Sequence, residues 1–261
     1  MNDTDVPTKK KYDFAMSLGA NCMAAHNLKI RNLRSVALPF DWTYVVDERA
    51  YVWLADHLCD DLRDLCRWEN LREIKPGDPE WNNEHAERVK YIDTASGFRF
   101  VNHFRRTADA RREYELVRKT LDRRIDRFLS MMASSSRVLM VVATRRMDIS
   151  PETLARLHGK LAERFPSTSV DIVYVKFGAS PDDAPRFADL GEWLTFRPVE
   201  RPSNRYDFDQ TNFEWAFLDE VACKTKDEER RRAKRNHFSL DIWPKVKLHV
   251  NFRLVRKGGE S

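Results

Sequence analysis

Helix-like and strand-like segments alternate through the middle of the chain, and this alternation constrains the fold most. Residues 111–132 place apolar side chains every three or four positions among charged ones, which is typical of an amphipathic helix. An apolar run at 137–143 (RVLMVVA), a second helical pattern at 151–165 and another apolar run at 170–176 (VDIVYVK) follow. Such an order favours strands in parallel with helices packed on them. We therefore predict an α/β fold with a mixed or parallel sheet and helices on both faces.

Local signals predict further elements around this unit. Strands are expected at residues 12–18 (YDFAMSL) and 98–104, and Ser150 before Pro151 is typical of a helix start. Residues 51–93 hold three tryptophans among many charges, and we predict a mostly helical insertion there. A last helix is expected at 211–223. No repeat or low-complexity tract divides the chain, so we predict one domain over residues 1–261.

Charge and hydropathy limit the classes of function. The segment 1–11 is expected to be a flexible tail, and the charged run 224–235 (KTKDEERRRAKR) a solvated segment. The net charge is only +5 because both signs are interleaved, so nucleic acid is not expected as a partner. Apolar runs are far shorter than the roughly 18 residues of a membrane span. No signal-peptide core precedes residue 12, so we expect a cytoplasmic protein without a membrane span.

No cofactor or metal is implied by the sequence. The four cysteines form no CxxC pair and fit no zinc-ligand spacing, so we interpret them as reduced thiols. The GxGxxG fingerprint of dinucleotide-binding folds is also absent, since Gly19 stands alone.

The densest chemical signal is the block SLGANC at residues 17–22, where a strand is expected to turn into a helix. A cysteine in the first turn of a helix lies among unpaired N–H groups that favour a negative charge, and this promotes the thiolate. The backbone N–H groups of Asn21 and Cys22 could also hold the oxyanion of a reacting carbonyl. Alternatively, Cys22 is a small buried hydrophobic residue at a tight turn.

A thiol nucleophile needs a base, and two histidines are candidates. His103 lies at the end of the expected strand 98–104, where the catalytic groups of α/β proteins gather. His26 follows Cys22 by four residues, so the two would share a helix face.

The motifs SLGANC, AAHNLKIRNLRSVALPFDW (24–42), FVNHF (100–104) and RVLMVVATR (137–145) resemble those of a bacterial family described as papain-like cysteine peptidases. The resemblance covers residues 12–176, and its first block is the most specific. It implies that Cys22 is the nucleophile and His103 the base. Asp41 lies at a family carboxylate position, either as a triad partner or as a structural residue. The alternating order of strands and helices suits a flavodoxin-like or esterase-like sheet better than a papain-like topology.

We therefore predict a cysteine hydrolase, peptidase or acyl transferase with Cys22, His103, Asp41 and Asn21 in its site. Either Asp41 or Asn102 would orient the histidine, and the substrate is an unknown peptide, ester or glycan-linked acyl group. The alternative is a non-catalytic or glycosyltransferase-like domain that binds phosphate or a nucleotide sugar at the helix start.

Overall fold

The computed structural model describes residues 10–79, 87–107, 109–145, 147–200 and 213–223. These residues all lie within the first of two units into which the chain divides, residues 1–225. The second unit, residues 226–261, lies outside the described residues, as does the charged run 224–235.

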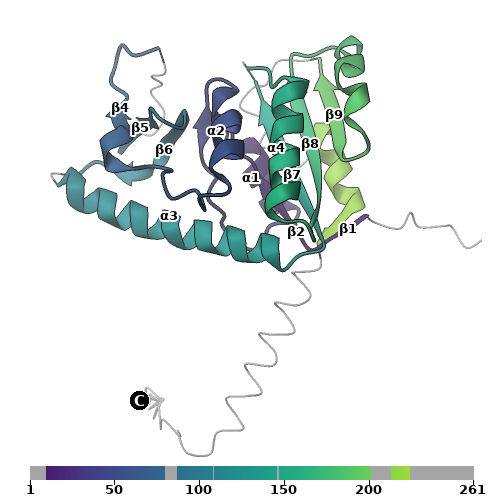
Figure 1. Cartoon of the computed structure of the whole chain (residues 1–261). Coiled ribbons are helices and arrows are strands. Elements are labelled where there is room, and N and C mark those ends of the chain that lie inside the picture. Colours follow the sequence, from purple (N-terminus) through teal and green to yellow (C-terminus); the bar gives the residue numbers. More distant parts are fainter. Residues whose placement is uncertain (1–9, 80–86, 108, 146, 201–212, 224–261) are drawn as a thin grey trace, which may run out of the picture. The chain divides into compact units, whose positions relative to one another are not determined.

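A four-stranded parallel sheet forms the centre of this unit (Figure 1). Its spatial order is β2 (Phe14–Ser17), β7 (Arg137–Thr144), β8 (Ser169–Phe177) and β9 (Leu194–Val199). The expected strands at 137–143 and 170–176 are confirmed as β7 and β8. Because all four strands run in one direction, their carboxyl ends share one edge of the sheet, and that edge is where α/β proteins place their ligands.

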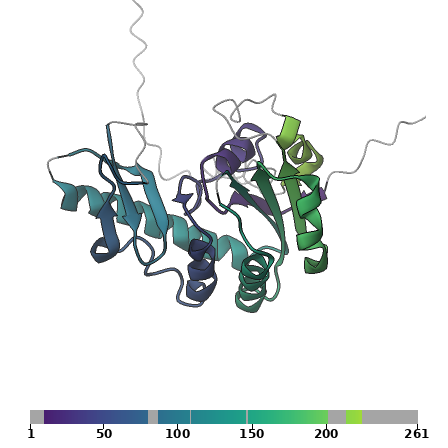
Figure 2. The same cartoon turned by 90° about the horizontal axis from the view of Figure 1, so that it is seen from above.

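Helices cover both faces of the sheet, as predicted (Figure 2). One face packs against α2 (Arg49–His57), α3 (Ala110–Ala133), α4 (Pro151–Arg164) and the 3-10 helix η2 (Pro181–Leu190). The other face packs against α1 (Met23–Ile30) and the 3-10 helix η4 (Phe213–Glu220). Both faces of β7 are buried, and this explains its continuous apolar run.

The two long helices begin where their sequence predicts. The side chain of Asp109 accepts a hydrogen bond from the Arg112 N–H at the start of α3. Ser150 caps α4 in the same way through the Thr153 N–H, and Pro151 occupies the first turn. Each cap satisfies an N–H group that has no partner within the helix.

The expectation of a mostly helical insertion at 51–93 is wrong in its second half. The region holds α2 and the short 3-10 helix η1 (Trp68–Asn70), but β4 (Leu71–Glu73) and β5 (Arg88–Asp93) follow. With β6 (Phe98–Arg105) and β3 (Tyr44–Val45) they form an antiparallel sheet of order β3-β6-β5-β4. The carboxylate of Asp93 accepts hydrogen bonds from Ser96, which closes the turn between β5 and β6. Strand β5 (RVKYID) was missed because three of its six residues are charged.

Two boundaries also differ from the predictions at the chain's ends. The expected strand 12–18 is divided at Asp13 into β1 (Lys10–Tyr12) and β2, and Lys10 therefore lies in a strand rather than in the expected tail. The expected helix 211–223 is the 3-10 helix η4 followed by β10 (Val221–Cys223). Strands β1 and β10 pair in parallel, so a contact between distant parts of the sequence decides both structures.

Candidate functional site

The block SLGANC forms a tight turn between β2 and α1. Gly19 and Ala20 both have positive φ angles, +85° and +70°. A Cβ atom at Gly19 would lie 2.6 Å from Oγ1 of Thr43, so glycine is required there both for its backbone conformation and for space. The turn thus places Cys22 against the segment that carries Thr43.

Asn21 holds this turn with its side chain. Its Oδ1 accepts a hydrogen bond from the Met23 N–H at 2.8 Å, and its Nδ2 donates to the carbonyl oxygen of Ala143 at 2.6 Å. The Asn21 side chain therefore satisfies the Met23 N–H at the start of α1 and ties this helix to the carboxyl end of β7. No acceptor for its backbone N–H lies among the described residues, so this donor remains available for an oxyanion.

Cys22 is the residue at the N-cap position of α1, and it is half-buried. Its Sγ lies 3.0 Å from the hydroxyl oxygen of Tyr44, which belongs to β3. A hydroxyl group at this distance can donate a hydrogen bond to a thiolate. Sequence reasoning missed Tyr44, although it stands only two residues after Trp42 in the motif that carries the family resemblance.

Asp41 is structural in this arrangement. Its carboxylate is fully buried, accepts the Leu38 N–H at 2.7 Å and forms an ion pair with Arg34, whose side chain is also buried. Burial raises the pKa of Asp41, and the positive charge of Arg34 offsets part of that effect. Asp41 fixes the loop between α1 and β3 and does not orient His103.

His103 lies in a bulge of β6. Between two paired positions, β5 has one residue, Lys90, where β6 has three, residues 101–103. Bulges of this kind redirect side chains. The imidazole of His103 contacts the ring of Phe100 edge-on, with ring centroids 5.2 Å apart.

Both ring nitrogens of His103 are buried and have no hydrogen-bond partner, although part of the residue remains accessible. Burial lowers the pKa of His103 to about 3, and the positive charges of Arg124 and Arg88 add to this effect. The imidazole is therefore neutral at ordinary pH.

The expected pair of Cys22 and His103 is not formed. Neither nitrogen of His103 hydrogen-bonds the sulfur, and neither Asp41 nor Asn102 hydrogen-bonds the imidazole. Tyr44, the neighbour of Cys22, pairs with Arg99 near the start of β6, and His103 follows four residues later. At strand spacing these four residues span about 13 Å. The register of β3 on β6 thus separates the two predicted site residues.

His26 occupies the position expected for a residue one helical turn after Cys22. Its backbone N–H donates to the Cys22 carbonyl oxygen at 2.9 Å, and its side chain is half-buried. Residues four apart on a helix are neighbours on one face. The structure therefore keeps His26 near Cys22 while it places His103 elsewhere.

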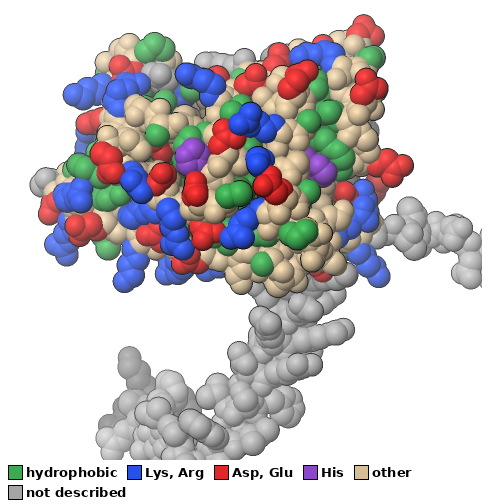
Figure 3. Space-filling model, viewed as in Figure 1, with side chains coloured by type: hydrophobic (Ala, Val, Ile, Leu, Met, Phe, Trp, Pro, Cys, Tyr) green, Lys and Arg blue, Asp and Glu red, His purple; other side chains and the backbone are tan. Residues whose placement is uncertain are grey.

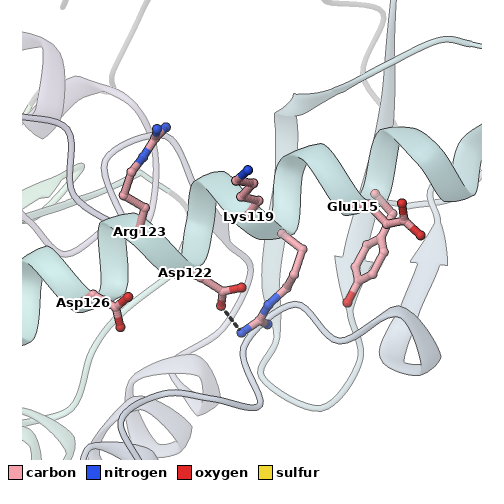
Figure 4. Close-up of a pocket in the computed structure, with 7 residues that line it drawn as sticks. Glu115, Lys119, Asp122, Arg123 and Asp126 are labelled. Atoms are coloured by element: carbon pink, nitrogen blue, oxygen red, sulfur yellow. Dashed lines mark hydrogen bonds and ion pairs between the residues drawn. The ribbon is translucent and has the colours of Figure 1, made fainter.

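A hollow of about 420 Å³ lies along α3, and Cys22 is not among its lining residues (Figure 4). Basic and acidic side chains alternate around it, and Arg118 is held by Asp122 and by the carbonyl oxygen of Leu65. Figure 3 shows the same mixture of signs over the face of the molecule that it draws. Ion pairs hold some of its charged side chains, Arg118 with Asp122 and Asp126 with Arg63.

The described residues give little support to other classes of ligand. Within the described part of the chain, no three His, Cys, Asp or Glu side chains form a group that could hold a metal ion. None of the helices described is both long and apolar enough to cross a membrane. At the start of α1, the Asn21 side chain already takes the Met23 N–H, which leaves one donor fewer for a bound phosphate.

Comparisons with known proteins find no relative of this chain. No family model, curated protein or solved structure matches the chain. The resemblance to the papain-like cysteine peptidases therefore stays a prediction from the sequence.

Proposed function

We propose that this protein is a thiol-dependent hydrolase or acyl transferase with Cys22 as its nucleophile. The observation that carries the proposal is the 3.0 Å contact between Cys22 Sγ and the Tyr44 hydroxyl at the N-cap of α1. The hydroxyl and the helix start both favour a negative charge on the sulfur. Two independent features thus support a reactive thiolate at the carboxyl edge of the parallel sheet.

In the proposed reaction, the Cys22 sulfur attacks the acyl carbon and the carbonyl electron pair moves onto oxygen. The Asn21 N–H, for which the described residues hold no acceptor, donates to this oxyanion. The tetrahedral intermediate collapses, the bond to the leaving amine or alcohol breaks, and a thioester on Cys22 remains. Water or an acceptor nucleophile then attacks the thioester and releases the sulfur.

We assign the proton transfers to His26 in place of His103. His26 lies one turn after Cys22 on α1, so it can accept the thiol proton and return it to the leaving group. His103 has its ring nitrogens buried away from Cys22. The proposal covers peptide, ester and glycan-linked acyl substrates, because all of them present an acyl carbon to the sulfur.

Acylation by p-nitrophenyl acetate tests the proposal directly. We expect release of nitrophenol together with an acetyl group on Cys22, located by mass spectrometry of peptides. His26→Gln should slow this step, whereas His103→Leu should leave it unchanged, and Cys22→Ala should abolish it. Cys59, an exposed thiol, is the internal control for ordinary reactivity. Acetylation of Cys22 no faster than of Cys59 would contradict the proposal.

A further inference from the structure

A cavity of about 120 Å³ opens at the carboxyl end of β8, and Cys22 is not among its lining residues. Its lining residues come from the end of β8, from η2 and β9, and from the segment after β7: Asp148, Lys176, Gly178, Ala179, Asp183, Arg186, Phe187 and Phe196. Strand β8 lies two positions from β2 in the sheet, so the cavity shares with Cys22 the edge at which α/β proteins bind ligands.

Lys176 supplies a nearly buried positive charge to this cavity. Its side chain is 12% exposed, and its nearest partners are a carboxylate oxygen of Asp148 at 3.4 Å and the Arg145 carbonyl oxygen at 3.5 Å. Charge-assisted hydrogen bonds between an ammonium and a carboxylate measure roughly 2.7–2.9 Å. Both partners are therefore too distant to satisfy the ammonium, which can accommodate a closer acceptor.

Neither acidic residue of the cavity makes a close contact with Lys176. Asp183 Oδ2 accepts the Ser180 N–H at 2.9 Å in the capping box of η2, so its carboxylate is held at the helix start. The Asp148 side chain is 62% exposed. Arg186, 3.9 Å from Asp183, adds a second cation. A ligand that brings a negative charge would gain both Lys176 and Arg186.

The size and shape of the cavity limit the ligand to a small group. Phe187 and Phe196 stack with ring centroids 4.3 Å apart beside the cavity. Gly178 has a φ of +76° and no atom within 4 Å of the position of a Cβ, so the backbone leaves this side open. A volume of about 120 Å³ suits a carboxylate or phosphate group.

We propose that Lys176 and Arg186 bind a small oxyanion, a carboxylate or a phosphate group, in this cavity. The ligand oxygen replaces the distant contacts of Lys176 with a close one, and Arg186 closes over the ligand from η2. The proposal does not involve Cys22, so it stands or falls independently of the thiol chemistry.

The test is a titration of the full chain with sodium phosphate and, separately, with sodium acetate, at constant ionic strength. Amide chemical shifts of residues 176–179 report binding by NMR. We expect saturable shifts with at least one anion, and the anion that saturates identifies a phosphate or a carboxylate site. Ethylammonium chloride should produce no saturable shift. No saturation by either anion would overturn the proposal.

Variants assign the binding to the two cations. Lys176→Met and Arg186→Gln should each weaken binding about tenfold or more, which corresponds to at least about 1.4 kcal/mol. The matched control is Lys160→Met, which removes the same charge from an exposed ion pair on α4. Arg186 is half-exposed, so its variant keeps the test valid even where Lys176→Met disturbs folding. Equal weakening in the Lys160 variant would show general screening and refute the site.

Discussion

The sulfur of Cys22 lies 3.0 Å from the hydroxyl oxygen of Tyr44. This contact joins the start of α1, the helix that follows β2 of the parallel sheet, to β3 of the antiparallel sheet. Tyr44 belongs to β3, which pairs with β6, whereas Cys22 is at the start of α1, shortly after β2. The chemistry proposed for the thiol therefore depends on how two separate sheets meet.

Removal of this hydroxyl should slow the reaction of Cys22 with iodoacetamide. A hydrogen bond to a charged group contributes about 1.5–3 kcal/mol, so Tyr44→Phe should lower the alkylation rate at pH 7 about tenfold or more. Tyr91→Phe, on β5, is the matched control. Rates are measured by mass spectrometry of the folded protein, and an unchanged rate in Tyr44→Phe would mean that the hydroxyl does not stabilise the thiolate.

The other cysteines should differ in reactivity according to burial. Burial raises the pKa of Cys66 far above its ordinary value and that of Cys223 to about 12. In native protein at pH 8, exposed Cys59 should therefore react and Cys66 should not. In urea all four should react at similar rates. Labelling of native Cys66 would show that its surroundings open on the timescale of the experiment.

Acid should destabilise the protein through His103. The folded-state pKa of His103 is about 3, against 6.5 in an unfolded chain, so between these values the unfolded state binds one more proton. Stability is then lost as pH falls from 6.5 towards 3, by about 1.4 kcal/mol per pH unit. When the pH is lowered from 7.5 to 5.0, the free energy of unfolding of His103→Leu should fall by about 2 kcal/mol less than that of the parent protein. Unfolding in urea measures both values.

The matched control for His103 is His57→Leu on α2, whose ring is partly exposed and has Nδ1 2.9 Å from the Trp53 carbonyl oxygen. This variant should keep the acid sensitivity of the parent. A parent-like pH dependence in His103→Leu would exclude His103 as its source.

The buried ion pair between Arg34 and Asp41 should be sensitive to the loss of either partner. Asp41→Ala leaves the Arg34 guanidinium buried without its carboxylate, and we expect the free energy of unfolding to fall by about 3–5 kcal/mol. Arg34→Met should lower the free energy of unfolding less when it is added to Asp41→Ala than when it is made in the parent protein. The exposed pair of Arg156 and Asp56 provides the control, with a loss of about 0–1 kcal/mol. Additive losses at the buried pair would contradict its coupling.

Gly19→Ala should destabilise the turn before Cys22 for two reasons, its φ of +85° and the approach of Thr43 to 2.6 Å. Backbone strain alone costs about 1–3 kcal/mol. Gly77→Ala is a matched control, because Gly77 also has a positive φ but open space around its Cα. Thermal unfolding should show a larger loss of stability for Gly19→Ala than for Gly77→Ala. Equal losses would mean that the contact with Thr43 does not contribute.

Much of the fold follows from local signals. The spacing of apolar residues in α3 and the Ser150 and Pro151 start of α4 are properties of short segments, and both predictions are confirmed. The strands β7 and β8 are equally local, since a continuous apolar run indicates burial on both faces. Of the second sheet only β6 was predicted, as the expected strand 98–104, because β4 and β3 are too short to carry a period of their own.

The candidate site was predictable only in part. The SLGANC block placed Cys22 at a helix start and Asn21 beside it, because a glycine turn between a strand and a helix is a local feature. The contact between Cys22 and Tyr44 could not be predicted from local sequence. Tyr44 reaches it from another sheet, and a bulge in β6 helps to direct His103 to a different environment.

The sequence by itself determined the α/β class, the long helices and the turn that presents Cys22, because each depends on periodicity and capping within a few residues. Tertiary structure alone decided that Tyr44 lies beside the sulfur and that His103 is buried without a hydrogen bond. Both outcomes depend on the register of β3, β5 and β6, and register is set by pairing between residues distant in the chain.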